Sequence, residues 1–197
     1  MKPSEPGITE RIATLDWPRI TGELDAQGYA TAPLLRPDEC RALADTYTAD
    51  ARFRRRIVMA QHGFGQGEYK YFAYPLPEVV AALRSALYPR LAGLANRWNE
   101  SMRTTTRYPD DLAAFLRRCH RAGQTRPTPL LLRYGEGDYN CLHQDLYGEH
   151  VFPLQVTVLL SVPGRDFTGG EFVLTEQRPR RQSRAEVVHL DQGDGVI

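Results

Sequence analysis

The chain changes character at Gly123, and this change constrains its fold more than any other feature of the sequence. Before Gly123, apolar residues repeat at helical spacing, most clearly between Pro77 and Asn96. After Gly123, short apolar segments alternate with glycine and proline turns, a pattern typical of antiparallel sandwiches and barrels. We therefore expect one α+β domain over residues 1–197, in which a mainly helical region, 1–124, supports a jelly-roll sheet core, 125–197.

Local signals place the individual elements. Helices are predicted where a cap or a proline precedes an apolar stripe, starting at Asp16-Trp17-Pro18, Arg36-Pro37-Asp38, Pro77 and Tyr108-Pro109-Asp110. Strands are predicted at Tyr29–Leu35, Ile57–Ala60, Tyr69–Phe72, Pro129–Tyr134, Tyr139–His143, Val151–Val162, Gly170–Thr175, Glu186–Leu190 and from Gly195 onward. The first 15 residues are expected to be loosely packed and without regular secondary structure.

Composition excludes some classes of protein. The formal net charge is +1, which is not the strongly basic body of a general nucleic-acid binder, so any contact with nucleic acid must be local. The cysteines at 40, 119 and 141 form no CxxC pair, which argues for a reducing compartment and against a disulfide framework. The start of the chain has no apolar run that could act as a signal peptide or membrane span. We expect a cytoplasmic protein without a membrane role.

The segment 131–145 reads as a strand, a glycine turn and a second strand that ends in His143-Gln144-Asp145. Residues two apart on a strand point to the same side, so we expect His143 and Asp145 to offer a nitrogen and an oxygen to one metal ion. Such a pair is two thirds of the 2-His-1-carboxylate triad of non-haem Fe(II) oxygenases. The alternative is a solvent-facing hydrogen-bonded pair that binds no metal.

Four features follow one another in a recognisable order: Tyr134, His143-Gln144-Asp145, Gly169-Gly170-Glu171-Phe172, and the turn Gly193-Asp194 before an apolar strand. Together they resemble the 2-oxoglutarate and Fe(II)-dependent dioxygenase superfamily, particularly its prolyl-hydroxylase-like branch. The resemblance implies a double-stranded β-helix in which His143 and Asp145 ligate Fe(II). It also implies that Tyr134 donates its hydroxyl to a carboxylate of 2-oxoglutarate and that Tyr139 lines the pocket, although both tyrosines could be ordinary core residues. Such an enzyme uses O2 and 2-oxoglutarate to hydroxylate a C–H bond.

One expected ligand is absent from the sequence. The superfamily places its second histidine, and an arginine or lysine that pairs with 2-oxoglutarate, after the apolar strand that here begins at Gly195. The sequence ends at Ile197, so we expect both residues and the last strands to lie beyond it, and the chain alone to hold Fe(II) poorly. His150 and His189 are not where the superfamily places this ligand.

The substrate is suggested by a narrower resemblance. Arg133-Tyr134, His143-Gln144-Asp145 and Gly169–Phe172 look like a bacterial oxygenase family proposed to demethylate damaged DNA oxidatively. Two arginine clusters could track phosphates: Arg52, Arg54, Arg55 and Arg56, and then Arg178, Arg180, Arg181 and Arg184. The glycine-rich segment from His62 to Tyr71 could stack an extruded base. The alternatives are solvated charge runs, a protein or small-molecule substrate, and a non-catalytic jelly-roll module.

Overall fold

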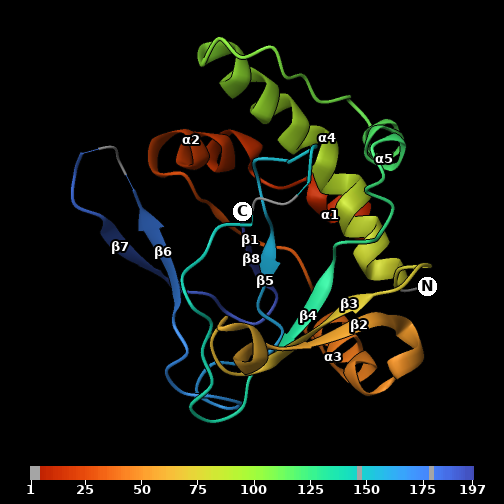
Figure 1. The fold of residues 1–197 in the computed structure, drawn as a ribbon, viewed down its shortest axis with the longest axis vertical. Helices are drawn as coiled ribbons and strands as arrows, with labels where there is room; N and C mark the ends of the chain where they lie inside the picture. The colour runs from red at the N-terminus through yellow and green to blue at the C-terminus, as the bar shows by residue number, and fades with distance from the viewer. Residues whose placement is uncertain (1–4, 146–147, 178–179) are drawn as a thin grey trace.

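Helices dominate the first half of the chain and short strands the second half (Figure 1). This computed structural model describes residues 5–145, 148–177 and 180–197. The helices are α1 (Ile8–Ala13), α2 (Trp17–Gln27), α3 (Pro37–Asp45), α4 (Glu78–Ser101) and α5 (Leu112–Arg121). The strands are β1 (Thr31–Pro33), β2 (Phe53–Val58), β3 (Glu68–Phe72), β4 (Leu130–Arg133), β5 (Thr157–Val158), β6 (Phe172–Glu176), β7 (Arg184–Val188) and β8 (Asp194–Val196).

Helices form at all four predicted starts, and a side-chain hydrogen bond caps two of them, α2 and α5. The Asp16 side chain accepts a hydrogen bond from the backbone nitrogen of Arg19 at 3.0 Å, and α2 ends just before Gly28. Asp111 caps α5 in the same way. Helix α1 lies in the segment that was expected to be loose, and it is ordered because its isoleucines are buried in the main core. None of the described helices is both long and apolar enough to cross a membrane.

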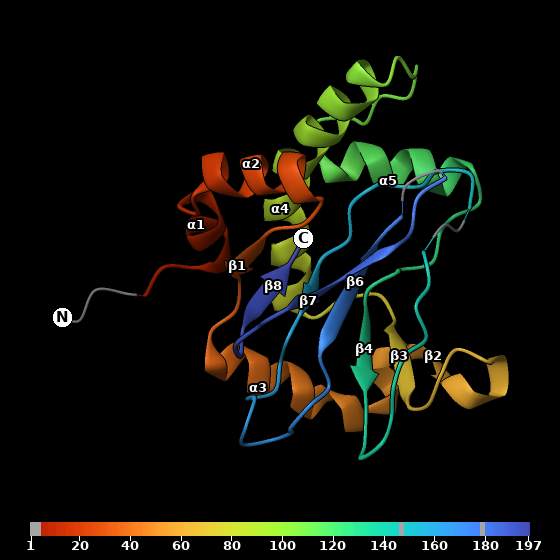
Figure 2. The same cartoon turned by 90° about the vertical axis from the view of Figure 1, so that its left-hand side faces the viewer.

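The described strands form three antiparallel sheets, with strand orders β1-β8-β5, β2-β3-β4 and β6-β7. Figure 2 shows α1, α2 and α5 above these sheets, α4 descending behind β1 and β8, and α3 below them. Both three-stranded sheets combine strands from before and after residue 124. A jelly roll arranges eight strands in two sheets, whereas these strands form three. The observed fold is therefore mixed α/β, and the double-stranded β-helix stays a prediction.

Three predicted strands are wrong in extent. The strand expected at Ile57–Ala60 is β2, which ends at Val58 and is followed by a 3-10 turn, Met59–His62. Residues 139–143 form only an isolated bridge, between Asn140 and Gly65, and the strand expected over 151–162 shrinks to β5. A strand needs a ladder of backbone hydrogen bonds to a neighbour. Within the described ranges, residues 139–143 find such bonds only at the glycine-rich turn before β3.

The last residues of the sequence are paired with neighbouring strands. Strand β8 is the middle strand of its sheet, and both Val196 and Ile197 are buried. Ile197 also exchanges two backbone hydrogen bonds with Ala30, at 2.9 and 3.1 Å. The apolar end of the chain is thus part of the main core.

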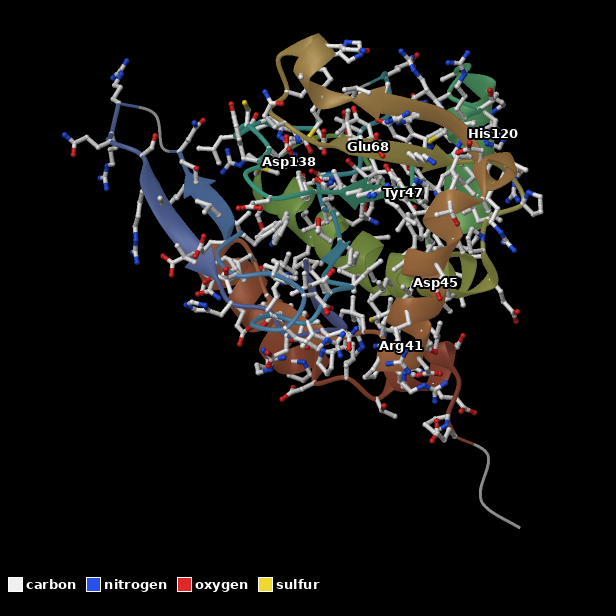
Figure 3. All side chains as sticks on the ribbon, turned by 90° about the horizontal axis from the view of Figure 1, so that it is seen from below. Arg41, Asp45, Tyr47, Glu68, His120 and Asp138 are labelled. Carbon is white, nitrogen blue, oxygen red and sulfur yellow. The ribbon has the colours of Figure 1, made fainter. Side chains whose placement is uncertain are left out.

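A polar cluster joins β3 to the segment after α3. Lys70 is only 8% exposed, and its ammonium donates to the Tyr47 carbonyl oxygen at 2.9 Å and to the Asp50 carboxylate at 2.7 Å. Glu68 accepts hydrogen bonds from the Tyr47 hydroxyl, at 3.0 Å, and from the Arg56 guanidinium; Figure 3 shows Tyr47 beside Glu68. Burial alone would raise the pKa of Glu68, but these hydrogen bonds outweigh it and lower the pKa. The cluster fixes which face of the β2-β3-β4 sheet is turned toward α3.

The turn before β8 packs closely against Leu35, and this contact can be tested by substitution. Gly193 has a φ of +90°, and a Cβ there would overlap the Leu35 carbonyl oxygen. We predict that Gly193→Ala lowers the free energy of unfolding by about 2–4 kcal/mol, because backbone strain and the close contact add. Gly22→Ala is the control, since its methyl group meets no atom within 4 Å in α2 and should stabilise slightly. Urea denaturation followed by circular dichroism measures both, and equal effects would contradict the prediction.

The acid stability of the fold should depend on Glu68. Its folded pKa is lowered, so its contribution to stability is present above its unfolded pKa and is lost as the pH falls through the folded pKa. We predict that Glu68→Gln lowers the free energy of unfolding at neutral pH by about 1–3 kcal/mol and flattens its decline below about pH 4. Glu100→Gln, at an exposed position near the end of α4, should leave the acid decline unchanged. Denaturation midpoints across the pH range would reveal the difference, and parallel curves for both variants would refute it.

Candidate metal site

His143 and Asp145 lie together, as the sequence predicted, although not on a strand. The distance from His143 Nε2 to Asp145 Oδ1 is 3.6 Å, and the side chains are 48% and 42% exposed. Neighbouring donor atoms around an octahedral ion with bonds of about 2.1 Å lie roughly 3 Å apart. A small side-chain rotation would therefore let both groups reach one ion, and solvent has access to both.

Cys141 orients the His143 ring. His143 Nδ1 lies 2.7 Å from the Cys141 carbonyl oxygen, and because a carbonyl only accepts, Nδ1 carries the proton. In the neutral imidazole the lone pair is then on Nε2, which is the atom that faces Asp145. Metal-binding histidines usually make such a second hydrogen bond, which fixes their tautomer. The two side chains thus present a free nitrogen and a carboxylate in the form that a divalent ion binds.

Within the part of the chain that the structure describes, His143 and Asp145 have no third metal ligand beside them. Among the described residues, no group of three or more His, Cys, Asp or Glu side chains could hold a metal ion. His150 is held elsewhere, because its backbone nitrogen and oxygen both bind the Gln124 side chain. His189 is exposed just after β7.

The glycine-rich turn before β3 holds the segment that carries the pair. Gln66 donates its backbone hydrogen bond to the Tyr139 carbonyl oxygen at 2.7 Å, and the Cys141 nitrogen donates to the Phe64 carbonyl oxygen at 2.9 Å. Gly65 has a φ of +121°, and a Cβ there would overlap the Tyr139 carbonyl oxygen. Sequence reasoning marked this turn but missed its contact with residues 139–141, since no local pattern links segments so far apart.

Tyr134 and Tyr139 lie at the two ends of the loop 134–139, and both contact the glycine-rich turn before β3. Tyr134 is 44% exposed, and its ring lies against Gly67, where a Cβ would approach its Cδ1 atom to 2.9 Å. Partial burial raises the pKa of Tyr134, although a hydrogen bond with the Asn140 side chain opposes the rise. Tyr139 is 56% exposed. Both tyrosines are therefore surface residues beside the glycine-rich turn and not core residues, which removes one alternative for each.

The arginine clusters have mixed roles. In the first, Arg56 binds Glu68, and Arg54 donates to the Pro127 carbonyl oxygen at 3.1 Å, so both contribute to the fold. Arg52 and Arg55 are exposed, and neither side chain has a partner within the described part of the chain. The second cluster is exposed where it is described, and Arg184 pairs with Glu186 at 3.1 Å. One of its members, Arg178, lies outside the described residues.

Comparisons with known proteins give the site a context. Residues 67–197, which include His143, Asp145 and both tyrosines, match a family described as an oxygenase catalysing oxidative methylation of damaged DNA. The chain belongs to this oxygenase family. Two versions of an uncharacterized protein, from two strains of Mycobacterium tuberculosis, are 47% identical to it over 154 residues. The match covers 76% of this chain and 66% of each relative, so the chain spans about two thirds of their length. No solved structure matches the chain.

The contact between the turn and residues 139–141 can be tested without any ligand. We predict that Gly65→Ala speeds amide hydrogen exchange at Gln66 and Cys141 by about tenfold or more, because the new methyl group pushes the turn off the Tyr139 carbonyl oxygen. Gly63→Ala is the matched control, since Gly63 also has a positive φ but no atom lies within 4 Å of its added Cβ. Exchange followed by NMR or mass spectrometry distinguishes the two. Unchanged exchange in Gly65→Ala would show that the turn does not hold this segment.

Proposed function

We propose that this chain is the larger part of a 2-oxoglutarate and Fe(II)-dependent oxygenase that removes alkyl groups from bases in damaged DNA. The observation that carries the proposal is the pair formed by His143 and Asp145, with the Nε2 lone pair free and 3.6 Å from a carboxylate oxygen. The family description, an oxygenase acting on damaged DNA, supports the class of reaction and the substrate.

The donor chemistry of the pair fits Fe(II). One imidazole nitrogen and one carboxylate oxygen are two of the three ligands in the facial triad of non-haem iron oxygenases. Iron bound there, with 2-oxoglutarate and O2, would supply the oxidising chemistry. The chain's own contribution is positional: the Cys141 carbonyl holds the His143 tautomer, and the exposed side chains leave room for further ligands.

The surroundings of Tyr134 support a role in binding the cosubstrate. It follows β4 directly, its hydroxyl bonds with the Asn140 side chain, and Asn140 is bridged to the turn beside the metal pair. We propose that Tyr134 donates to a 2-oxoglutarate carboxylate and that Tyr139 lines the same pocket. The sheets that carry these residues would belong to a double-stranded β-helix, with strands from the remainder of a longer protein.

A second candidate is favoured by one observation. The described residues bring no third donor to His143 and Asp145, which is what a non-catalytic module would show. An oxygenase needs that third ligand from elsewhere in the protein, whereas a module needs none. Metal binding and turnover therefore separate the two candidates.

The metal pair makes a direct prediction. His143→Ala and Asp145→Asn should each weaken Mn(II) or Fe(II) binding roughly tenfold or more, because each removes one of two protein ligands. Calorimetry under anaerobic conditions measures the binding, and succinate formation from 2-oxoglutarate with a methylated oligonucleotide measures turnover in the complete protein.

His189→Ala is the matched control, because it removes an exposed histidine far along the chain and should leave binding and turnover unchanged. Equal metal binding by His143→Ala and the unsubstituted protein would refute the proposed ligand set. A complete protein that binds no metal would favour the non-catalytic module.

A further inference from the structure

We propose that the face of the β2-β3-β4 sheet opposite α3 is a platform on which an unpaired DNA strand lies. We call it the tyrosine face. Its strand positions are Arg55, Ile57, Tyr69, Tyr71, Leu130 and Leu132. The inference rests on the proposed function, because it assigns a binding surface to the same DNA substrate.

The register of the strands defines this face. Tyr69 pairs with Ile57 on one side and with Leu132 on the other, and residues directly opposite one another share a face. Lys70 and its partners, one residue along, point the other way and pack toward α3. Alternation therefore separates a face that buries Lys70 and Leu131 from the tyrosine face. On the tyrosine face Arg55 and Leu132 are exposed, the two tyrosines are half-buried, and Ile57 at one end is buried.

The tyrosine face carries two aromatic rings, one of which contacts a guanidinium. The rings of Tyr69 and Tyr71 meet edge to face with centroids 5.4 Å apart, and the Arg54 guanidinium lies 4.3 Å from the centroid of Tyr71. Leu132 beside them is 41% exposed. Aromatic rings and arginine planes are the groups on which unpaired bases stack.

The charge of this face suits a polyanion. No acidic residue occupies any of the strand positions that define it. The Arg55 side chain is exposed and has no partner among the described residues. Burial lowers the pKa of Arg54, and the nearby positive charge of Arg126 lowers it further. The acidic residue of β3, Glu68, lies on the opposite face, where Arg56 neutralises it. Phosphates on the tyrosine face would therefore meet cations without competing carboxylates.

The tyrosine face leads to the candidate metal pair. At one end, the Tyr134 ring lies against Gly67, directly after β4. The same turn bonds through Phe64 to the Cys141 nitrogen, and the Cys141 carbonyl holds His143. A strand lying along the tyrosine face would thus deliver a base toward His143, and a base must leave the duplex to be modified.

The test uses anisotropy of a short fluorescein-labelled oligothymidine. Tyr71→Leu should weaken binding about fivefold or more, and Tyr71→Phe should keep it, because stacking needs the ring and not the hydroxyl. Arg55→Gln should reduce the slope of log K against log salt by about 0.7, as expected for one lost phosphate contact with a single strand. Arg41→Gln is the control, since Arg41 is exposed on α3, beyond the opposite face of the sheet (Figure 3).

A second readout locates the strand directly. An oligonucleotide with one 5-iodouracil, irradiated in the complex, should crosslink to Tyr69 or Tyr71, as mapped by mass spectrometry. If the oligonucleotide binds but all variants bind equally, or crosslinks fall outside the tyrosine face, the inference is overturned while DNA remains the substrate. If nothing binds even at low salt, the proposed action on DNA fails and this inference fails with it.

Discussion

The buried ammonium of Lys70 is the interaction on which the rest of the arrangement depends. An unpaired charge in an apolar interior is costly, and Lys70 avoids that cost only where Asp50 and the Tyr47 carbonyl meet it. A shift of one residue in the register of β3 would expose Lys70 and bury Tyr69 and Tyr71 in its place. The inward lysine therefore determines that the tyrosines face outward.

The glycine-rich turn connects the fixed register of β3 to the position of the candidate metal site. Because β3 is fixed in register, the turn before it is fixed too, and its backbone bonds hold residues 139–141. Cys141 then links the turn to His143 through its carbonyl oxygen. A side chain at Gly65 could not fit beneath Tyr139, so the close approach requires glycine. The position of a candidate metal ligand thus depends on a strand pairing far from it in sequence.

Sequence reasoning succeeded where the determining contacts are local. The cap at Asp16 and the stop at Gly28 predicted α2, and the strand after Gly170 was predicted close to its observed position, because a few neighbouring residues decide each. It failed for residues 139–143, whose backbone partners among the described residues all lie in the turn before β3. His143 and Asp145 were expected to converge through strand alternation. They converge instead in a loop braced by Cys141, so the outcome was right and its predicted cause was wrong.

The net charge of +1 conceals a separation of charge between the two faces of one sheet. On the face toward α3, Arg56 pairs with Glu68 and Lys70 pairs with Asp50, so these cations contribute little to the field outside the protein. On the other face, Arg55 has no carboxylate opposite it, because its neighbour in register is Tyr71. The total charge counts these cations equally, but a phosphate would respond mainly to the uncompensated one. A chain that is almost neutral overall can therefore still bind a polyanion at one place. The net charge indicated that any contact with nucleic acid must be local, but it could not show where that contact lies.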